Sequence, residues 1–251
     1  MTHPPSQPRL IGIGVGPGDP DLITLKATRA LEIADAVLVP ATEESGDGPG
    51  RAEQIVLANA PDARIVRVPF SMADRSGVSP RRKAAWLASA TAAVDAFDDG
   101  ARCVAFATVG DPSVYSTFSY LAAHVLERRP DVAVEVIPGI TAMQALAATS
   151  RTPLVEGTET LALVPVTAGL DALERVLDAV DTVVAYKGGR RMPEVVATLR
   201  SKGRDAVLGV NLGLDRQELI RLADLDDDAT APYFSTVLAP AARGDQAGGR
   251  L

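Results

Sequence analysis

Cysteine and histidine are scarce in this 251-residue chain, and long apolar runs are missing from it. The single cysteine, Cys103, excludes an internal disulfide framework, and with only two histidines it argues against a structural zinc site. No apolar run approaches the roughly 20 residues that a membrane span needs. The first residues also lack the basic and apolar regions of a secretory signal peptide. We therefore expect a protein of the reducing cytoplasm that binds no metal.

Positive charge is also in short supply, since the formal net charge is −7. This balance disfavours general attraction to nucleic acid or to an anionic membrane. A polyanionic ligand would need a local basic patch, and three are available: Arg81 to Lys83, Lys187 with Arg190 and Arg191, and Arg51. The alternative for each patch is a solvated helix end.

Short apolar runs rich in Val, Ile and Ala alternate along the chain with helical patterns. The runs are nearly continuous in apolar residues, as expected for strands that are covered on both faces. This alternation predicts an α/β protein with mostly parallel sheets. The predicted strands are 10–15, 36–39, 64–68, 103–108, 132–137, 160–164, 182–185, 206–210 and 233–239.

A break near residues 151–158 divides these strands into two groups, because Pro153 and Gly157 punctuate the chain there. We therefore predict two α/β domains, residues 9–153 and 157–240, with disordered tails at 1–8 and 241–251. A single doubly wound domain is the alternative. The stretches 41–50 and 70–79 are expected to be long loops, which in compact domains often border a site.

A glycine-rich loop, residues 14–20, directly follows the first predicted strand. Glycines at 14, 16 and 18 allow the backbone to turn sharply and to approach a ligand closely. The spacing is not that of a dinucleotide or P-loop motif, because Pro17 interrupts the first and no Lys-Ser/Thr pair completes the second. Asp19 would repel phosphate, so the loop suits a cationic or zwitterionic ligand. The alternative is a tight turn before a helix, capped by Asp19 or Asp21, without any ligand.

Two further loops have the same character. Gly110-Asp111-Pro112 follows the predicted strand 103–108, and a helix is expected to begin near Ser113. Residues 138–142 follow the strand 132–137. Because parallel strands end at the same edge of a sheet, we expect the three loops to converge on one cleft.

These three loops, in this order, resemble the signatures of the tetrapyrrole methylase family, and the resemblance covers residues 9 to 240. It implies the two-domain class III methyltransferase fold and a homodimer. It also implies S-adenosylmethionine as methyl donor, bound between the domains, and a small-molecule tetrapyrrole as acceptor. The run from Gly110 to Leu121 is most similar to the branch that methylates C20 of precorrin-2 in cobalamin biosynthesis. The cobalt-loaded substrate and the uroporphyrinogen-III branch are the alternatives.

The resemblance also assigns residues to the site, position by position. Leu212 and Gly213 lie in a loose match to the family pattern. No general base is identified, because His3 is in a predicted tail and His124 is expected to be a surface or packing residue. For the substrate's carboxylates the candidates are Arg81, Arg82 and Lys83, with Tyr115 against the macrocycle. The implied cofactor contacts are Pro17, Val109, Gly110, Asp111, Val114, Tyr115, Thr141, Ala142, Tyr186, Lys187, Leu212 and Gly213.

Two readings from other classes remain open at this point. A nicotinamide dehydrogenase would use the first loop for its cofactor, but the glycine spacing argues against it. A tetrapyrrole-binding module without activity would retain the three loops and lose only the chemistry.

Overall fold

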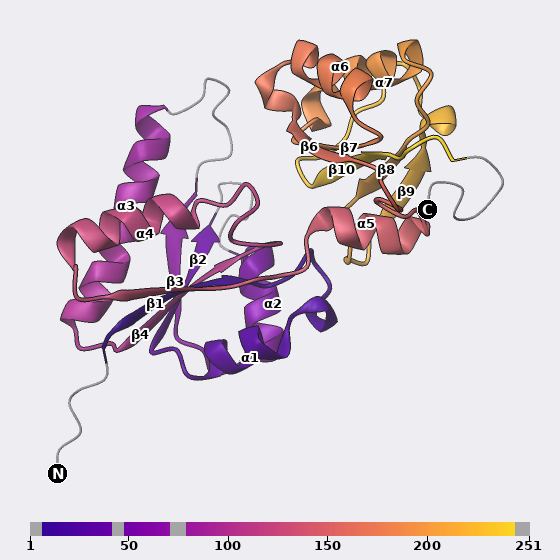
Figure 1. Ribbon diagram of the computed structural model, residues 1–251. Coiled ribbons are helices and arrows are strands. Elements are labelled where there is room, and N and C mark those ends of the chain that lie inside the picture. Colours follow the sequence, from indigo (N-terminus) through magenta and orange to yellow (C-terminus); the bar gives the residue numbers. More distant parts are fainter. Residues whose placement is uncertain (1–6, 42–47, 71–78, 244–251) are drawn as a thin grey trace. The chain divides into compact units, whose positions relative to one another are not determined.

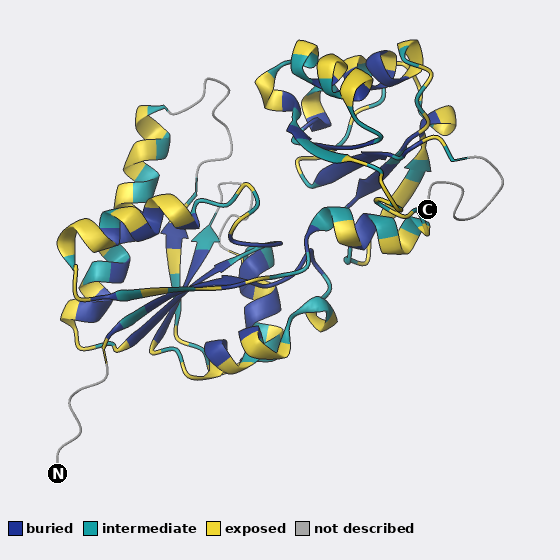
Figure 2. Ribbon diagram, viewed as in Figure 1, coloured by how far each residue is buried: buried dark blue, intermediate teal, exposed yellow. Residues whose placement is uncertain are grey.

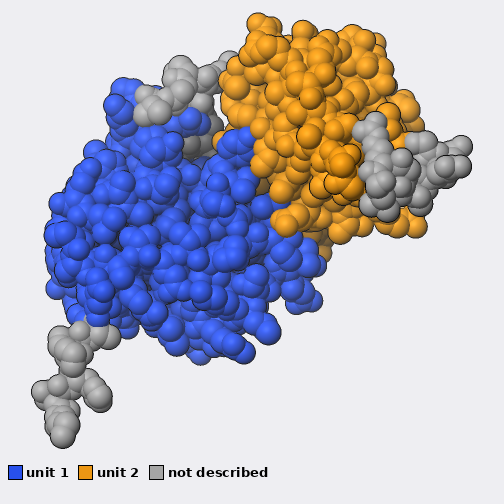
Figure 3. Space-filling model, viewed as in Figure 1, with its two compact units in different colours: residues 1–141 blue, residues 142–251 orange. Residues whose placement is uncertain are grey.

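The computed structural model describes residues 7–41, 48–70 and 79–243 (Figure 1). The chain forms two compact units, residues 1–141 and 142–251, which are coloured separately in Figure 3. Each unit contains one five-stranded sheet with its own helices. The predicted α/β class with two sheets is confirmed.

The sheet of unit 1 has the strand order β3-β2-β4-β1-β5, and every neighbouring pair is parallel. All five strands therefore end at the same edge. Their positions agree with the predicted runs to within two residues at either end. The strands are β1 (Arg9–Gly14), β2 (Ala36–Ala41), β3 (Ile65–Pro69), β4 (Cys103–Thr108) and β5 (Ala133–Ile137).

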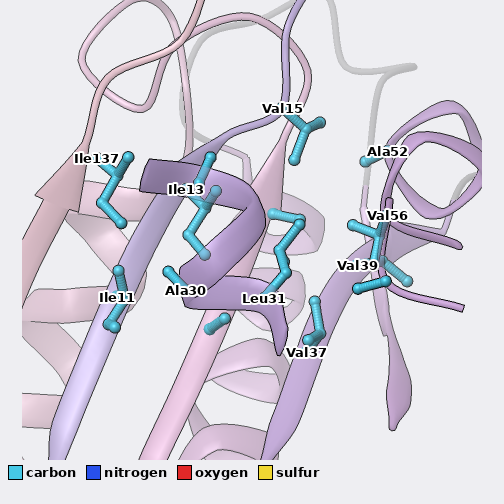
Figure 4. Packing of buried hydrophobic residues seen from close by; sticks show 14 of the residues in the cluster. Ile11, Ile13, Val15, Ala30, Leu31, Val37, Val39, Ala52, Val56 and Ile137 are labelled. Carbon is cyan, nitrogen blue, oxygen red and sulfur yellow. The ribbon is translucent and has the colours of Figure 1, made fainter. Parts of the chain in front are cut away.

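Helices cover both faces of this sheet, and buried residues lie along the strands between them (Figure 2). Helices α1 (Leu25–Glu32) and α2 (Arg51–Asn59) pack on one face, where Figure 4 shows Ile13 of β1 close to Leu31 of α1. Helices α3 (Pro80–Asp98) and α4 (Phe118–Arg128) pack on the other. Since successive side chains of a strand point to opposite faces, strands covered on both faces have to be apolar throughout.

Two helices of unit 1 begin later than the sequence predicted. Asp19 caps only a short 3-10 helix, Pro20–Leu22, and α1 starts after Thr24, whose hydroxyl accepts from the Ala27 N–H at 3.2 Å. The helix expected from Ser113 begins at Phe118. Tyr115 has a φ of 52°, in the left-handed region, and this conformation is incompatible with a right-handed helix through that position.

An aromatic pair joins α3 to α4. The rings of Trp86 and Tyr120 stack with their centroids 4.2 Å apart and their planes 8° from parallel. Helix α3 itself starts where its sequence favours a start, because Ser79 accepts from the Arg82 N–H and Pro80 occupies the first turn. Trp86 is the only tryptophan of the chain.

The sheet of unit 2 has the order β6-β7-β10-β8-β9 and differs from the expectation of a mostly parallel sheet. Only β6 and β7 are parallel, because β10 inserts antiparallel between β7 and β8, and β9 returns antiparallel beside β8. The edge strand β9 was not predicted. The strands are β6 (Leu161–Pro165), β7 (Thr182–Tyr186), β8 (Val207–Val210), β9 (Glu218–Arg221) and β10 (Ser235–Ala239).

Helices also cover both faces of the second sheet. Helices α6 (Leu170–Ala179) and α7 (Met192–Ser201) pack on one face. Helix α5 (Ala142–Ser150) packs on the other, where Leu146 lies against Leu238 of β10. The units therefore divide before α5, about ten residues ahead of the break near 151–158. Short 3-10 helices span Val166–Ala168, Gly189–Arg191 and Leu222–Asp224.

The described chain continues past β10 into part of the segment that was expected to be a tail. The Ala241 N–H donates to the Thr182 hydroxyl at 3.0 Å. Arg243 forms an ion pair with Glu159, whose side chain is only 1% exposed, and donates to the Pro153 carbonyl at 3.0 Å. The residues up to Arg243 are thus part of the packed unit.

Candidate active site

Three loops leave adjacent strands at one edge of the unit 1 sheet. Strand β1 lies between β4 and β5, with Gly14 opposite Thr108 and Ile13 opposite Ile137. The first loop (residues 14–20), second loop (109–117) and third loop (138–141) therefore start side by side. The structure brings them together at the carboxyl ends of parallel strands, where open α/β sheets bind ligands.

The three loops touch through their glycines. A Cβ added to Gly14 would lie 2.6 Å from both the Gly110 carbonyl oxygen and the Gly139 nitrogen, and one added to Gly139 would lie 2.7 Å from the Gly14 carbonyl carbon. The Gly110 N–H donates to the Gly16 carbonyl at 2.7 Å and forms an isolated antiparallel bridge. Only glycine permits these approaches, so the loops form a cradle of backbone atoms.

The cradle has open space at its centre. Gly110 is buried and has a φ of 76°, yet an added Cβ there would meet only the Thr141 Cα, at 3.9 Å. None of the residues in the three loops is Lys or Arg, while Asp19 and Asp111 are acidic. Loops with acidic but no basic side chains suit a cationic or zwitterionic ligand better than a phosphate.

Asp111 has its carboxylate turned into the protein. One oxygen accepts from the Ser113 N–H at 2.7 Å and from the Ser113 hydroxyl, and the other accepts from the Gly139 N–H at 2.9 Å. Burial by itself raises the pKa of Asp111, but hydrogen bonds from the Ser113 hydroxyl, the Gly139 N–H and the Ser113 N–H outweigh it. The net result is a pKa below the ordinary value, so the group is ionised at neutral pH.

The rest of the second loop presents Tyr115. Its ring is 41% exposed, and partial burial raises the pKa of its phenol. Val114 lies in the turn that the Asp111 carbonyl closes by accepting from its N–H at 3.1 Å. The Ser116 hydroxyl accepts from the Phe118 N–H at 3.2 Å and so ends the loop at the first turn of α4.

The other candidates of unit 1 surround the same cradle. Pro17 and Thr141 are buried, and Val109 packs against the hydrophobic core beneath the first loop. The hydrogen-bond partners of Asp111, namely Ser113 and Gly139, were not predicted from the sequence. The Asp-x-Ser spacing could have indicated the first, since aspartate often accepts from the backbone N–H two residues on.

In unit 2 the remaining candidates also gather at one place. Tyr186 is the last residue of β7 and Lys187 follows it, while Leu212 and Gly213 lie just after β8. Both strands pair with β10 near its start. The Tyr186 hydroxyl accepts from the Met143 N–H at 3.1 Å, which ties the end of β7 to Ala142 and the first turn of α5. The Leu212 side chain is buried in the core under α5.

Backbone strain marks these positions. Lys187 has a φ of 61° and Asn211 has a φ of 50°, both in the left-handed region that non-glycine residues rarely adopt. Tyr115, with a φ of 52°, is a third non-glycine residue with a positive φ. Tyr115 and Lys187 are themselves candidate cofactor contacts, and Asn211 precedes the candidate Leu212. Such strain is often concentrated at functional sites.

The basic candidates lie further along the same edge of the unit 1 sheet. Arg81, Arg82 and Lys83 occupy the first turn of α3, which follows β3, two strands from β4. Arg51 begins α2, and burial lowers the pKa of its guanidinium. Most of the loops 41–50 and 70–79 lies outside the described residues.

Other expectations concern metals, histidines and membranes. Among the described residues, no cluster of His, Cys, Asp or Glu is arranged to hold a metal ion. His124 contacts Glu127 one turn along α4, at 3.2 Å, whereas His3 is outside the described residues. Within those same residues, every helix is too short or too polar to span a bilayer.

Glycine loops at the carboxyl edge of a parallel sheet are typical of an α/β protein that binds a small ligand, and the acidic side chains beside them favour a positively charged one. The chain belongs to the tetrapyrrole (corrin/porphyrin) methylases, since the model of that family matches residues 9–226. This membership places it among methyl-transfer enzymes rather than dehydrogenases.

Particular relatives are similar over almost the whole chain. A precorrin-2 C(20)-methyltransferase from Sinorhizobium sp. is 35% identical over 236 residues, which are 92% of this chain and 95% of that protein. A cobalt-precorrin-2 C(20)-methyltransferase from Salmonella typhimurium is 31% identical with the same coverage. Among solved structures, the uroporphyrin-III C-methyltransferase of Thermus thermophilus, complexed with S-adenosylhomocysteine, matches with a TM-score of 0.65 and 23% identity, over 92% of this chain and 97% of that one.

Proposed function

We propose that this chain transfers a methyl group from S-adenosylmethionine to C20 of precorrin-2 in corrin biosynthesis. The observation that carries the proposal is the cradle of Gly14, Gly110 and Gly139, in a chain of which 92% is similar to a precorrin-2 C(20)-methyltransferase. The relative from Salmonella typhimurium makes cobalt-precorrin-2 the second candidate acceptor.

The cradle of unit 1 fits the methyl donor. The space at Gly110 admits a ligand against bare backbone, and the loops offer backbone carbonyl oxygens to a sulfonium and an ammonium group. Pro17, Val109 and Val114 supply apolar contacts to the methionine part, and Thr141 contacts the adenosine. In unit 2 we assign Ala142, Tyr186, Lys187, Leu212 and Gly213 to the adenosine as well.

When bound, S-adenosylmethionine would supply an electrophilic methyl group, and the neutral thioether left after transfer, S-adenosylhomocysteine, would depart without needing a proton. The residues of the chain therefore have to orient the two reactants and exclude water, effects that can contribute about 7–11 kcal/mol to catalysis. We do not assign Asp111 as the base for the proton that C20 must later lose, because its carboxylate is turned into the protein and its hydrogen bonds lower its pKa.

On the acceptor side, the first turn of α3 is suited to carboxylates. Arg81 and Lys83 are exposed, and guanidinium groups bind carboxylates through two parallel hydrogen bonds. The exposed ring of Tyr115 can pack on the macrocycle. These residues give an acidic substrate a local binding surface in spite of the net charge of −7.

The direct test is incubation with methyl-labelled S-adenosylmethionine and either precorrin-2 or its cobalt-loaded form. We expect one label per macrocycle, at C20, and the ratio of the two kcat/KM values identifies the acceptor. Binding of the macrocycle without any incorporation of label would instead show a binding module.

A matched pair of variants tests where the methyl donor binds. Gly110→Val and Gly203→Val both place a Cβ at a positive φ, 76° and 60°, and apart from the neighbouring residues no protein atom lies closer to that Cβ than 3.9 Å. Their backbone strain is therefore similar, but only Gly110 lies in the cradle. We expect Gly110→Val to abolish S-adenosylhomocysteine binding in calorimetry and Gly203→Val to retain it. Equal affinities would refute the placement.

The quaternary state and compartment belong to the same proposal. We propose a cytoplasmic homodimer, as the family resemblance implies. Sedimentation equilibrium at micromolar concentration should give twice the chain mass of 26.1 kDa. A single species of monomer mass would contradict it.

A further inference from the structure

The carboxylate of Asp111 connects two loops that are 28 residues apart in sequence. One oxygen holds the second loop through Ser113, and the other accepts the Gly139 N–H of the third loop at 2.9 Å. Asp111 is 92% buried, since its relative exposure is 8%. The hydrogen bond spans the contact at which the third loop packs against Gly14.

We propose that Asp111 is a positioning residue that fixes the shape of the cradle before the methyl donor arrives, and that its carboxylate does not itself bind the donor's positive charge. This inference rests on the proposed function. It differs from the simpler expectation that an acidic side chain beside a cationic ligand pairs with it. The geometry favours positioning, because Asp111 is buried and each of its two oxygens accepts a hydrogen bond from a different loop.

Only a carboxylate satisfies this arrangement. All three partners are donors, namely two backbone N–H groups and the Ser113 hydroxyl. An asparagine has one accepting oxygen and one donating NH2 group. Whichever way the amide turns, its NH2 group faces a donor, so either Gly139 or Ser113 loses its acceptor. The third loop then loses its connection to the second, or the second loop loses its turn.

The close glycine packing explains why the connection matters. The Gly139 backbone lies against both Gly14 and Gly110, with no room even for a methyl group. The loops have to be held together at this distance for the cradle to keep its form. Pre-organisation of this kind lowers the entropic cost of binding.

The test compares Asp111→Asn with Asp35→Asn in the full-length protein. Asp35 is a suitable control because its carboxylate also accepts two backbone N–H bonds, from Arg102 at 2.7 Å and Cys103 at 2.8 Å. These bonds lie at the start of β4, whereas the cradle lies at its end. Both variants thus remove a carboxylate that accepts from two backbone N–H groups, but only Asp111→Asn affects the loops.

Three measurements decide the question. Amide hydrogen exchange without ligand should be at least tenfold faster at Gly139 in Asp111→Asn and unchanged there in Asp35→Asn. S-adenosylmethionine carries a positive sulfonium, whereas the sulfur of S-adenosylhomocysteine is neutral. In Asp111→Asn the affinities for both compounds should fall by the same factor, about tenfold or more. In the wild type, affinity should also fall as pH is lowered through the pKa of Asp111, and this dependence should be absent in Asp111→Asn.

Two results would overturn the proposal. One is unchanged exchange at Gly139 in Asp111→Asn. The other is a selective loss of S-adenosylmethionine affinity with S-adenosylhomocysteine affinity retained, which would show direct pairing with the sulfonium. If the wild type bound neither compound, the proposed function would fail, while the exchange measurement would still report on the role of Asp111.

Discussion

Replacing Gly139 by alanine should disrupt the cradle, because the added Cβ would lie about 1 Å too close to backbone atoms of the neighbouring loops. The added Cβ would lie 2.7 Å from the Gly14 carbonyl carbon, whereas carbon atoms in contact are normally about 3.5–4.0 Å apart. The Gly110 carbonyl oxygen lies even closer to it, and because all of these atoms are backbone, the third loop has to move away from the first and second loops by about 1 Å. Overpacking of this kind costs about 1–3 kcal/mol of stability.

The effect on activity should exceed the effect on stability. A shift of about 1 Å in a positioning element can reduce catalysis about 100-fold. We therefore expect kcat/KM of Gly139→Ala to fall about 100-fold, which corresponds to about 2.7 kcal/mol of transition-state stabilisation. The assay is methyl transfer to the macrocycle from labelled donor, with urea unfolding measured on the same sample.

Gly100→Ala provides the control. Gly100 lies before β4, at the opposite edge of the same sheet, and has a φ of 100° with nothing within 4 Å of an added Cβ. Alanine there is strained by about 1–2 kcal/mol, a loss of stability similar to that at Gly139. We expect its kcat/KM to stay within twofold of the wild type. If Gly139→Ala also retained wild-type kcat/KM, contact between the loops would not be what shapes the site.

Three other predictions concern strain, pH and the end of unit 2. Lys187→Gly should relieve a φ of 61°, worth about 1–2 kcal/mol less the roughly 0.5–1 kcal/mol that glycine loses to chain entropy. Thermal unfolding should show equal or higher stability, while calorimetry shows weaker S-adenosylhomocysteine binding; unchanged affinity would contradict a role for the strain. Because the pKa of Asp111 is lowered in the folded state, its stabilising contribution is present above the unfolded pKa of about 3.9 and is lost as pH falls through the lower folded value. Urea unfolding at a series of acidic pH values should therefore show a shallower pH dependence in Asp111→Asn than in the wild type, and parallel curves would count against it. Arg243→Ala should cost about 3 kcal/mol, because it leaves the buried Glu159 carboxylate without its cation. Urea unfolding would show this, and a change below about 0.5 kcal/mol would mean that the ion pair contributes little.

The strands of unit 1 could be predicted because each carries its own signal. The run Cys103–Thr108 is apolar at every position but the last, and a strand covered on both faces has no other simple sequence pattern. Strand β9 lacked that signal, since Glu218–Arg221 is short and half charged and lies at an edge. The insertion of β10 between β7 and β8 was equally hidden, because pairing between strands far apart in sequence leaves no mark in either strand.

The features of the site likewise fall into those that could be predicted from the sequence and those that could not. Glycines at the ends of β1, β4 and β5 indicated where a ligand would approach, because both the glycine and the strand end are local features. The left-handed φ of Tyr115 was not foreseen, since tyrosine rarely adopts it and helix-forming neighbours suggested an earlier start of α4. The hydrogen bond from Gly139 to Asp111 depends on two loops that meet only after folding.

The stacked pair of Trp86 and Tyr120 provides an intrinsic fluorescence signal that reports on unit 1. Trp86 is the only tryptophan, and it lies in unit 1, so tryptophan emission follows the melting of that unit alone. Far-ultraviolet circular dichroism follows the helices of both units. Superimposable denaturation curves from the two signals would describe one cooperative protein, whereas separate midpoints would describe two units that melt independently, each with its own free energy of unfolding.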